Sequence, residues 1–208
     1  MIVHLPDLDK RMKERRVDKT AETRARIERA ALKHFVEQGI AETSIRDIAD
    51  EARVSLGAMY NHFESKEELA WQLFVNGWNE FGEQLARCES GQPDFKSKMR
   101  VMIEYVFRRF DEDWLSVTYV FSSRHQHLKR VLARPGRARL NPHSVFWHVI
   151  AQAMQRGEIP QGDLDLKTTL MVGAIIQAID SRILGRLKGG LADFAPAAAD
   201  LCIRMLGG

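Results

Sequence analysis

The 208-residue sequence has few cysteines and no long apolar run. Its two cysteines, Cys88 and Cys202, lie far apart and form no Cys-x-x-Cys pair, which indicates reduced thiols rather than a disulfide framework. No apolar run reaches the roughly 18 residues that a membrane span needs. The charged N-terminus also lacks the apolar stretch of a secretion signal. We therefore expect a cytoplasmic globular protein with no membrane partner.

A strong excess of one charge is missing as well. The formal net charge is +3, and residues 1–64 contain as many acidic as basic side chains. Such a balance excludes a diffuse polycation that binds nucleic acid by bulk charge alone. It leaves open a docking surface on which a few donors are placed individually.

Patterns for catalysis and metal binding do not stand out either. No nucleophile lies near a base, and no glycine-rich phosphate loop is present. His125 and His127 are two residues apart, so they point to different faces of a helix, and the five-residue spacing of His143 and His148 is equally poor for one face. We expect no catalytic residue, no metal and no cofactor, and a protein that is not an enzyme.

What the chain does contain is helical periodicity throughout, with no alternating strand pattern. Residues 20–38 form the first expected helix, which Gly39 can end. Residues 43–66 then have the pattern of two short helices joined by a turn. Ser44 can cap the first helix and Ser55 the second, which would end near His62. This arrangement is the frame of a helix-turn-helix, whose second helix enters the major groove of DNA.

The sequence from about residue 20 to residue 70 resembles the DNA-binding domain of TetR/AcrR-type transcriptional regulators. The matching residues are Thr23, Arg24, Ile27, Ala30, Ala31, Phe35, Gly39, Thr43, Ser44, Ile45, Ile48, Ala49, Ala52, Val54, Ser55, Gly57, Tyr60, His62, Phe63, Ser65, Lys66, Glu67 and Leu69. The resemblance implies an all-α homodimer that represses transcription, with a variable C-terminal domain that usually binds a small molecule. We accordingly expect a helix-turn-helix DNA-binding domain at 19–66 and a helical effector-binding and dimerisation domain at 67–208. Before them, Pro6 and the many charges of residues 1–18 predict a flexible basic arm.

The resemblance also implies which side chains contact a double-stranded DNA operator. Tyr60, His62 and Lys66 match positions that contact phosphates, and Thr43 matches a capping position close to the DNA backbone. Arg46 matches a position that can reach a base edge, where arginine can bind guanine. The predicted DNA-binding residues are Arg24, Thr43, Ser44, Arg46, Ser55, Leu56, Gly57, Ala58, Tyr60, Asn61, His62 and Lys66. Met59, between two of them, is expected in the core.

Aromatic and methionine side chains in the second part of the chain suggest a pocket for an apolar or aromatic effector. The candidates are Trp78, Phe81, Met99, Met102, Tyr105, Trp114, Tyr119 and Trp147. The alternative is that most of them are core residues. A helix from residue 65 to about 87 would link this pocket to the DNA-binding domain.

Two neighbouring helices are candidates for a four-helix dimer interface. The first offers Val145, Val149, Gln152 and Ala153, and the second offers Leu166, Leu170, Gly173, Ala174, Gln177 and Ala178. Packing within one subunit is the alternative. The leading hypothesis is a sequence-specific repressor released from its operator by a small effector. The alternatives are a family member without a small ligand, controlled by a protein partner, then a helical enzyme and a protein-interaction module.

Overall fold

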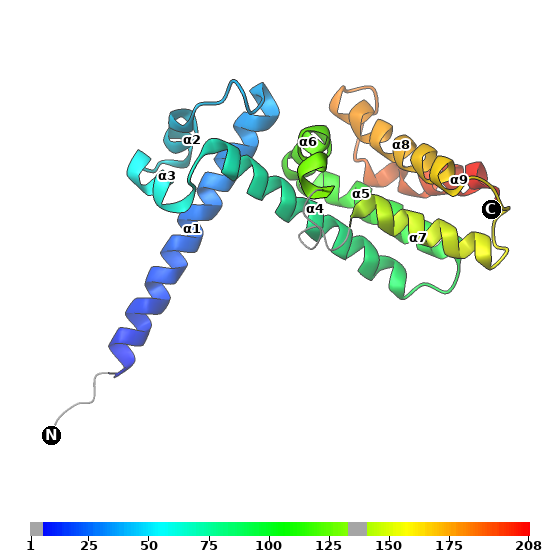
Figure 1. The fold of residues 1–208 in the computed structure, drawn as a ribbon, viewed down its shortest axis with the longest axis horizontal. Helices are drawn as coiled ribbons and strands as arrows, with labels where there is room; N and C mark the ends of the chain where they lie inside the picture. Colours follow the sequence, from blue (N-terminus) through cyan, green and yellow to red (C-terminus); the bar gives the residue numbers. More distant parts are fainter. Residues whose placement is uncertain (1–5, 133–140) are drawn as a thin grey trace. The chain divides into compact units, whose positions relative to one another are not determined.

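The computed structural model describes the backbone of residues 6–132 and 141–208, without the side chains of residues 6–18, 128, 129 and 132. All regular structure in these residues is helical, which confirms the predicted all-α fold (Figure 1). The helices are α1 (Pro6–Gln38), α2 (Ile45–Ala52), α3 (Leu56–His62), α4 (Lys66–Ser90), α5 (Phe95–Glu112), α6 (Trp114–Leu132), α7 (Pro142–Gln155), α8 (Leu164–Ile183), the 3₁₀ turn η1 (Ala192–Phe194) and α9 (Ala195–Leu206).

The chain divides into two compact units, Met1–Leu73 and Phe74–Gly208. The division falls inside α4, so this one helix contributes residues to both units. The predicted domain boundary at residues 66 and 67 lies at the start of the same helix. In the first unit α1, α2, α3 and the first turns of α4 enclose a small core. Its fully buried side chains include Ile27, Ile48, Met59 and Leu69.

Helix α1 begins at Pro6, well before the start expected near residue 20. Proline is well suited to the first turn of a helix, because its missing N–H would have no partner there. Residues 7–18 contain no further proline and no glycine, and five of them are lysine or arginine, which are good helix formers. Of the predicted flexible arm, residues 1–5 lie outside the described residues, and the backbone of the remainder is helical.

The turn between α2 and α3 depends on a left-handed residue. Arg53 has φ 55° and ψ 49°, and its N–H points back to the carbonyls of Ala49 and Asp50. The next N–H, of Val54, donates to Ala49 O over 2.9 Å. This is the usual way to end a helix, although glycine is the residue that adopts the conformation without steric cost. The reversal at Arg53 leaves Ser55 free to start α3.

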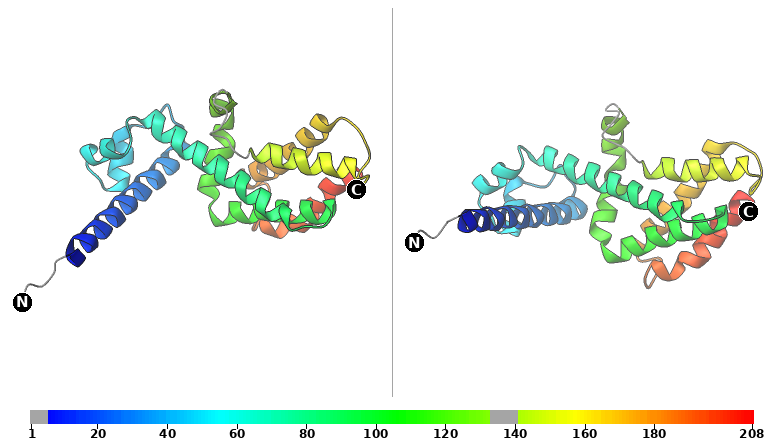
Figure 2. Two further views of the ribbon diagram at one scale, coloured as in Figure 1. Left: turned by 60° about the horizontal axis from the view of Figure 1, so that its bottom comes forward. Right: turned by 90° about the horizontal axis from the view of Figure 1, so that it is seen from below.

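The second unit is built around α5, which contacts α6, α7, α8 and α9 (Figure 2). Seven α5 side chains are buried: Phe95, Met99, Met102, Ile103, Val106, Phe107 and Phe110. Helix α6 runs unbroken from Trp114 to Leu132. Its approach to α4 requires Gly77, because a Cβ there would lie 2.7 Å from Val120 Cγ2.

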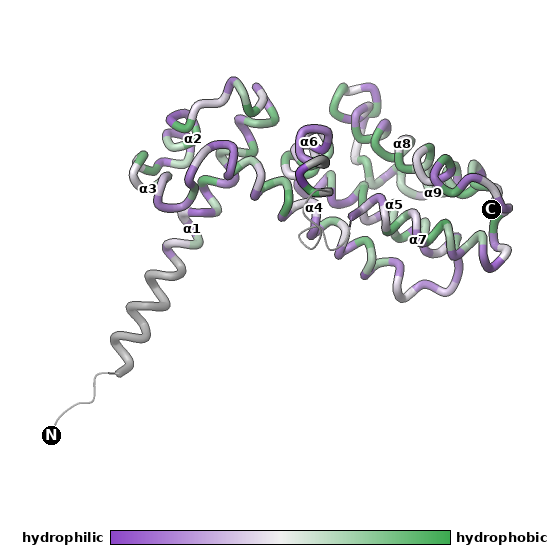
Figure 3. The backbone as a smooth tube through the Cα atoms, viewed as in Figure 1, coloured by the Kyte–Doolittle hydropathy of each residue, from purple (hydrophilic) through white to green (hydrophobic). Residues whose placement is uncertain are grey.

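The predicted dimer helices differ in their environment. On α7, Val145, Val149 and Ala153 are buried in the unit's own core, so that face packs within the subunit and the prediction for these three residues is wrong. On α8, the exposed residues include Leu166, Leu170, Gly173, Ala174 and Gln177. Hydrophobic residues, green in Figure 3, recur along α8 and α9. The apolar spacing in the sequence predicts which side of each helix is apolar, but it does not predict whether that side packs within the subunit or against a second subunit.

None of the described helices combines the length and hydrophobicity that crossing a membrane requires.

Candidate nucleic-acid interface and ligand cavity

The exposed residues of α2 and α3 form one candidate interface in the first unit. They include seven of the predicted DNA-binding residues: Ser44, Arg46, Ser55, Leu56, Gly57, Tyr60 and Asn61. Tyr60 is 56% exposed and Leu56 37%. Met59, on the opposite side of α3, is fully buried, as the sequence predicted. The short helix therefore packs by one side and presents the other to solvent.

Serine caps hold both helices in place. Ser44 Oγ accepts from Asp47 N–H over 3.1 Å, and Asp47 Oδ2 accepts from Ser44 N–H over 3.2 Å. This reciprocal pair satisfies two backbone donors that a helix start otherwise leaves open. The hydrogen bonds from Ser44 also hold the pKa of Asp47 below its ordinary value. Ser55 Oγ accepts in the same way from Ala58 N–H, over 3.1 Å.

The fold itself does not require Gly57. A Cβ at this position would meet only Ser55 Oγ, at 3.9 Å, which is an ordinary van der Waals distance. No positive φ is recorded for it. Since nothing within the chain demands glycine, the small residue leaves room for an outside partner to approach the backbone of α3.

The structure corrects the role predicted for Thr43. Its side chain is only 1% exposed, and Oγ1 donates to Gly39 O over 2.7 Å. A buried hydroxyl with this partner joins the end of α1 to the start of α2 and is not available to DNA. The sequence placed Thr43 correctly beside a helix start but could not show which way its hydroxyl points.

The side chain of Lys66 also makes hydrogen bonds within the first unit. Its ammonium donates to Thr43 O over 2.7 Å and to Ala41 O over 3.1 Å, and the side chain is 18% exposed. The lysine thus ties the first turn of α4 to the loop before α2. A phosphate contact remains a prediction for this residue, and the two carbonyls give it a structural role that the sequence did not reveal.

Arg24 is engaged within the first unit as well. Its guanidinium donates to Gln72 Oε1 over 2.8 Å, pairs with Glu28 over 2.8 Å, and lies 4.6 Å from the centre of the Phe63 ring. These contacts connect α1 with α4 and with the residue that ends α3. Of the remaining predicted residues, Ala58 and His62 are half-buried.

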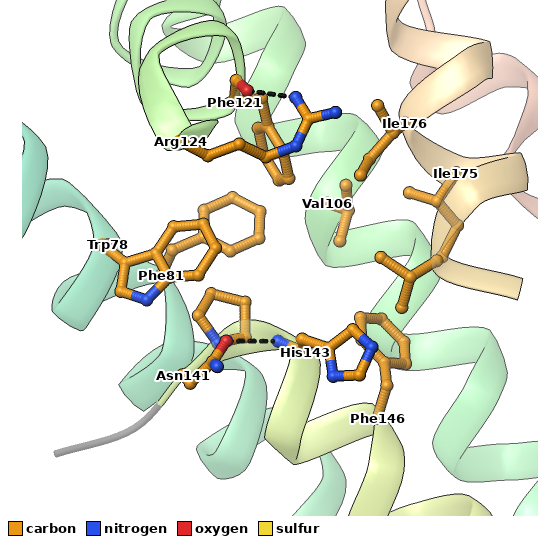
Figure 4. Close-up of a pocket in the computed structure, with 12 residues that line it drawn as sticks. Trp78, Phe81, Val106, Phe121, Arg124, Asn141, His143, Phe146, Ile175 and Ile176 are labelled. Carbon is orange, nitrogen blue, oxygen red and sulfur yellow. Dashed lines mark hydrogen bonds between the residues drawn. The ribbon is translucent and has the colours of Figure 1, made fainter. Parts of the chain in front are cut away.

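The second unit contains a cavity of about 330 Å³, within the range of small-molecule sites. The described residues that line it are Trp78, Phe81, Val106, Phe121, Arg124, Asn141, Pro142, His143, Phe146, Val172, Ile175 and Ile176. They come from α4, α5, α6, α7 and α8, with Asn141 just before α7. In Figure 4 the side chains of α6 and α7 face each other across the space, and most of the wall is apolar.

Two of the eight predicted pocket residues, Trp78 and Phe81, line this cavity. Met99, Met102 and Tyr119 are buried in the core and do not line it. Tyr105 packs against Phe81 with ring centres 5.3 Å apart, and burial raises the pKa of its phenol to about 12. Trp114 is 47% exposed, and Trp147 donates from Nε1 to Asp165 over 2.8 Å. Which residues bind an effector remains a prediction.

The sequence reasoning missed the polar residues of the cavity, Arg124, Asn141 and His143. Arg124 donates to the carbonyl of Phe121, and Asn141 Oδ1 caps α7 by accepting from His143 N–H over 2.9 Å (Figure 4). The cap at Asn141 was readable from the sequence, but its place in a cavity wall was not. One turn after Arg124, His127 packs against Phe74 with ring centres 4.8 Å apart, and burial lowers its pKa, as Arg130 does to a smaller degree.

Comparison with known proteins identifies the family. The family model "Bacterial regulatory proteins, tetR family" matches residues 27–73. The HTH-type transcriptional regulator TtgR of Pseudomonas putida is 30% identical over 168 residues, which are 74% of this chain and 76% of TtgR. The chain belongs to the TetR family. It is accordingly a DNA-binding transcriptional regulator and not an enzyme, as the sequence predicted.

Solved structures with low sequence identity share the TetR-family fold. A TetR-family regulator from Marinobacter aquaeolei VT8 superimposes with a TM-score of 0.72 at 20% identity, over 92% of this chain and 98% of that chain. FadR from Bacillus subtilis, in complex with stearoyl-CoA, gives 0.70 at 19% identity, over 86% and 97%. The family match confirms a DNA-binding helix-turn-helix but leaves the individual contacts as predictions.

The substitution Gly57→Ala should change operator affinity without lowering thermal stability. Gly57→Ala should leave thermal stability unchanged or raise it, since alanine is the better helix former and has room. It should nevertheless weaken operator binding, because the added methyl occupies the space that the DNA needs. Gly91→Ala, at a loop glycine that also has open space, is the matched control. Unchanged DNA affinity of Gly57→Ala would show that the α3 backbone does not approach DNA closely.

Arg46 and Lys66 should differ in their effects on binding and stability. Arg46→Ala should relax preference at one base pair, at a cost of about 1–3 kcal/mol, without lowering the melting temperature. Lys66→Met should lower the melting temperature and weaken binding to all sequences. If its role is structural, the dependence of affinity on salt should keep its slope. A slope smaller by about one, with unchanged stability, would instead make Lys66 a phosphate contact.

Proposed function

We propose that this protein is a homodimeric transcriptional repressor that leaves its operator when an apolar effector occupies the cavity of the second unit. The observation that carries the proposal is the position of that cavity on α4. Trp78 and Phe81 of α4 form part of its wall, and Lys66 of the same unbroken helix holds the loop before α2. A ligand that packs on Trp78 and Phe81 therefore acts on the helix that also supports the helix-turn-helix.

Release follows from a difference in affinity between two conformations. An effector shifts an equilibrium only if it binds the non-DNA-binding conformation more tightly than the other. Moving the population from 1:99 to 99:1 would take about 5.5 kcal/mol of such a difference. The FadR structure with stearoyl-CoA supports an apolar ligand for a protein of this fold. A regulator of this kind works in the cytoplasm, where its operator is.

The dimer would form through the exposed side of α8 and α9. Leu166 and Leu170 on α8 are 55% and 54% exposed, and Leu201 and Met205 on α9 are 61% and 47% exposed. Lys167 Nζ donates to Leu206 O over 3.0 Å, which holds the start of α8 beside the end of α9. A twofold dimer places two recognition helices about one DNA turn apart, roughly 34–36 Å, so the operator would be a near-palindrome.

The direct test is footprinting on the DNA beside the protein's own gene, followed by selection from genomic fragments. We expect a protected near-palindromic site, and a reporter gene behind that site should be repressed. Activation of the reporter would contradict the repressor role. Absence of any selected site would contradict sequence-specific binding.

A charge in the proposed interface should dissociate the dimer. Leu170→Glu should be monomeric at concentrations where the unaltered protein is a dimer, because a carboxylate would be buried without a partner. The monomer should also lose most of its operator affinity. Analytical ultracentrifugation measures the mass, with Gln155→Glu at the end of α7 as an exposed charge control. A Leu170→Glu protein that stays dimeric would place the interface elsewhere.

Filling the cavity should remove the response to effector while preserving DNA binding. Val172→Phe adds a ring at the wall formed by α8, whereas Ile176→Val on the same wall removes one methyl group and keeps the space open. Decanoate, decanol and naphthol serve as first apolar probes in operator-release assays. We expect a probe that releases the unaltered protein to release Ile176→Val but not Val172→Phe. Equal release of Val172→Phe would mean that the effector binds outside this cavity.

A further inference from the structure

The cavity wall contains one cation among its described residues, the guanidinium of Arg124 on α6. Arg124 is half-buried, and its neighbours in the wall include Phe121, Val106 and Ile176 (Figure 4). No carboxylate lies within ion-pair distance of it in the described residues. Its partner there is the carbonyl of Phe121, three residues earlier on the same helix.

This arrangement differs from that of the other arginines whose ion pairs we describe. Arg24, Arg100, Arg108 and Arg109 each pair with an acidic side chain. A guanidinium carries five N–H donors, so one carbonyl leaves most of them without an acceptor from the described protein. Removing a charge from water without a counter-ion costs free energy.

Two other donors in the same wall also have no acceptor among the residues that the structure describes. The indole nitrogen of Trp78 is buried and has no hydrogen-bond partner in the described structure. Asn141 uses its Oδ1 to cap α7, so its amide NH₂ remains as a donor. The described wall therefore offers a surplus of donors and one positive charge within an otherwise apolar lining. A ligand that brings acceptors and negative charge would satisfy these donors and balance the guanidinium.

We propose that the effector is an apolar molecule with a single carboxylate, and that Arg124 binds this carboxylate. The proposal rests on the proposed function, in which the cavity holds the effector. The planar guanidinium matches a carboxylate with two parallel hydrogen bonds. One arginine also balances one negative charge, whereas a phosphate monoester carries more than one at neutral pH. The apolar wall receives the chain or ring of the acid.

Matched probes that differ only in the head group test the charge. Isothermal titration calorimetry of the full-length protein compares decanoate with decanol and decylamine, and naphthoate with naphthol. We expect at least one acid to bind about tenfold or more tightly than its neutral partner, and decylamine to bind most weakly. Equal or weaker binding of both acids, including no binding at all, overturns the proposal. Tight binding of decyl phosphate, above that of the acids, would also overturn the choice of a carboxylate.

Variants of Arg124 assign the effect to this residue. Arg124→Gln should remove the tenfold preference for the acid and leave the binding of the alcohol unchanged, while Arg124→Lys should retain part of it. Arg130→Gln on the same helix, outside the cavity wall, is the control and should retain the full preference. Without ligand, Arg124→Gln should melt at the same or a higher temperature, because the half-buried charge has no counter-ion among the described residues. A preference that survives in Arg124→Gln overturns the proposal.

The operator-release assay distinguishes failure of this inference from failure of the proposed function. If decanol releases the operator as well as decanoate, and Val172→Phe blocks both, the cavity is the effector site but the carboxylate preference is wrong. If the acids bind through Arg124 and never release the operator, the carboxylate site stands and the effector role fails.

Discussion

The bond between the Lys66 ammonium and the carbonyls of Ala41 and Thr43 is the contact on which the first unit depends. It fixes the first turn of α4 against the loop that leads into α2. The buried hydroxyl of Thr43 fastens that loop to the end of α1. Because α2 and α3 are short, their own hydrogen bonds cannot hold them in place. Their placement comes from this polar junction and from the small core beneath it.

In the proposed mechanism, α4 connects this polar junction to the ligand cavity. Beyond Leu73, the residues of α4 belong to the second unit. There the missing side chain of Gly77 leaves room for Val120, and Trp78 and Phe81 line the cavity. In the proposed mechanism, a change in packing at Trp78 is carried along α4 to its first turns. In the proposed mechanism the ligand therefore need not touch the DNA-binding unit. It needs to favour one packing of α4 over another.

The sequence predicted the first unit well because its signals are local. Capping serines, the apolar spacing of α2 and the buried Met59 are all set by neighbours within a few positions. The cavity was predicted poorly because burial in a helix has the same period whether the side chain meets protein or empty space. Met102 and Phe81 carry the same signal in sequence and both are buried, yet only Phe81 lines the cavity. Arg124 carried no signal, since a helical arginine is ordinarily solvated.

Gly57 and Gly77 look alike in the sequence, but the fold requires glycine at only one of them. Both lie in helices and have negative φ, and the sequence alone does not distinguish them. At Gly77 the fold demands glycine, because any Cβ would collide with Val120. At Gly57 the fold does not, because the added atom would meet only open space beside Ser55. Glycine costs helix stability at either position, and only at Gly77 does packing within the chain offset that cost. At Gly57 the predicted close approach of DNA to the exposed side of α3 would account for the glycine.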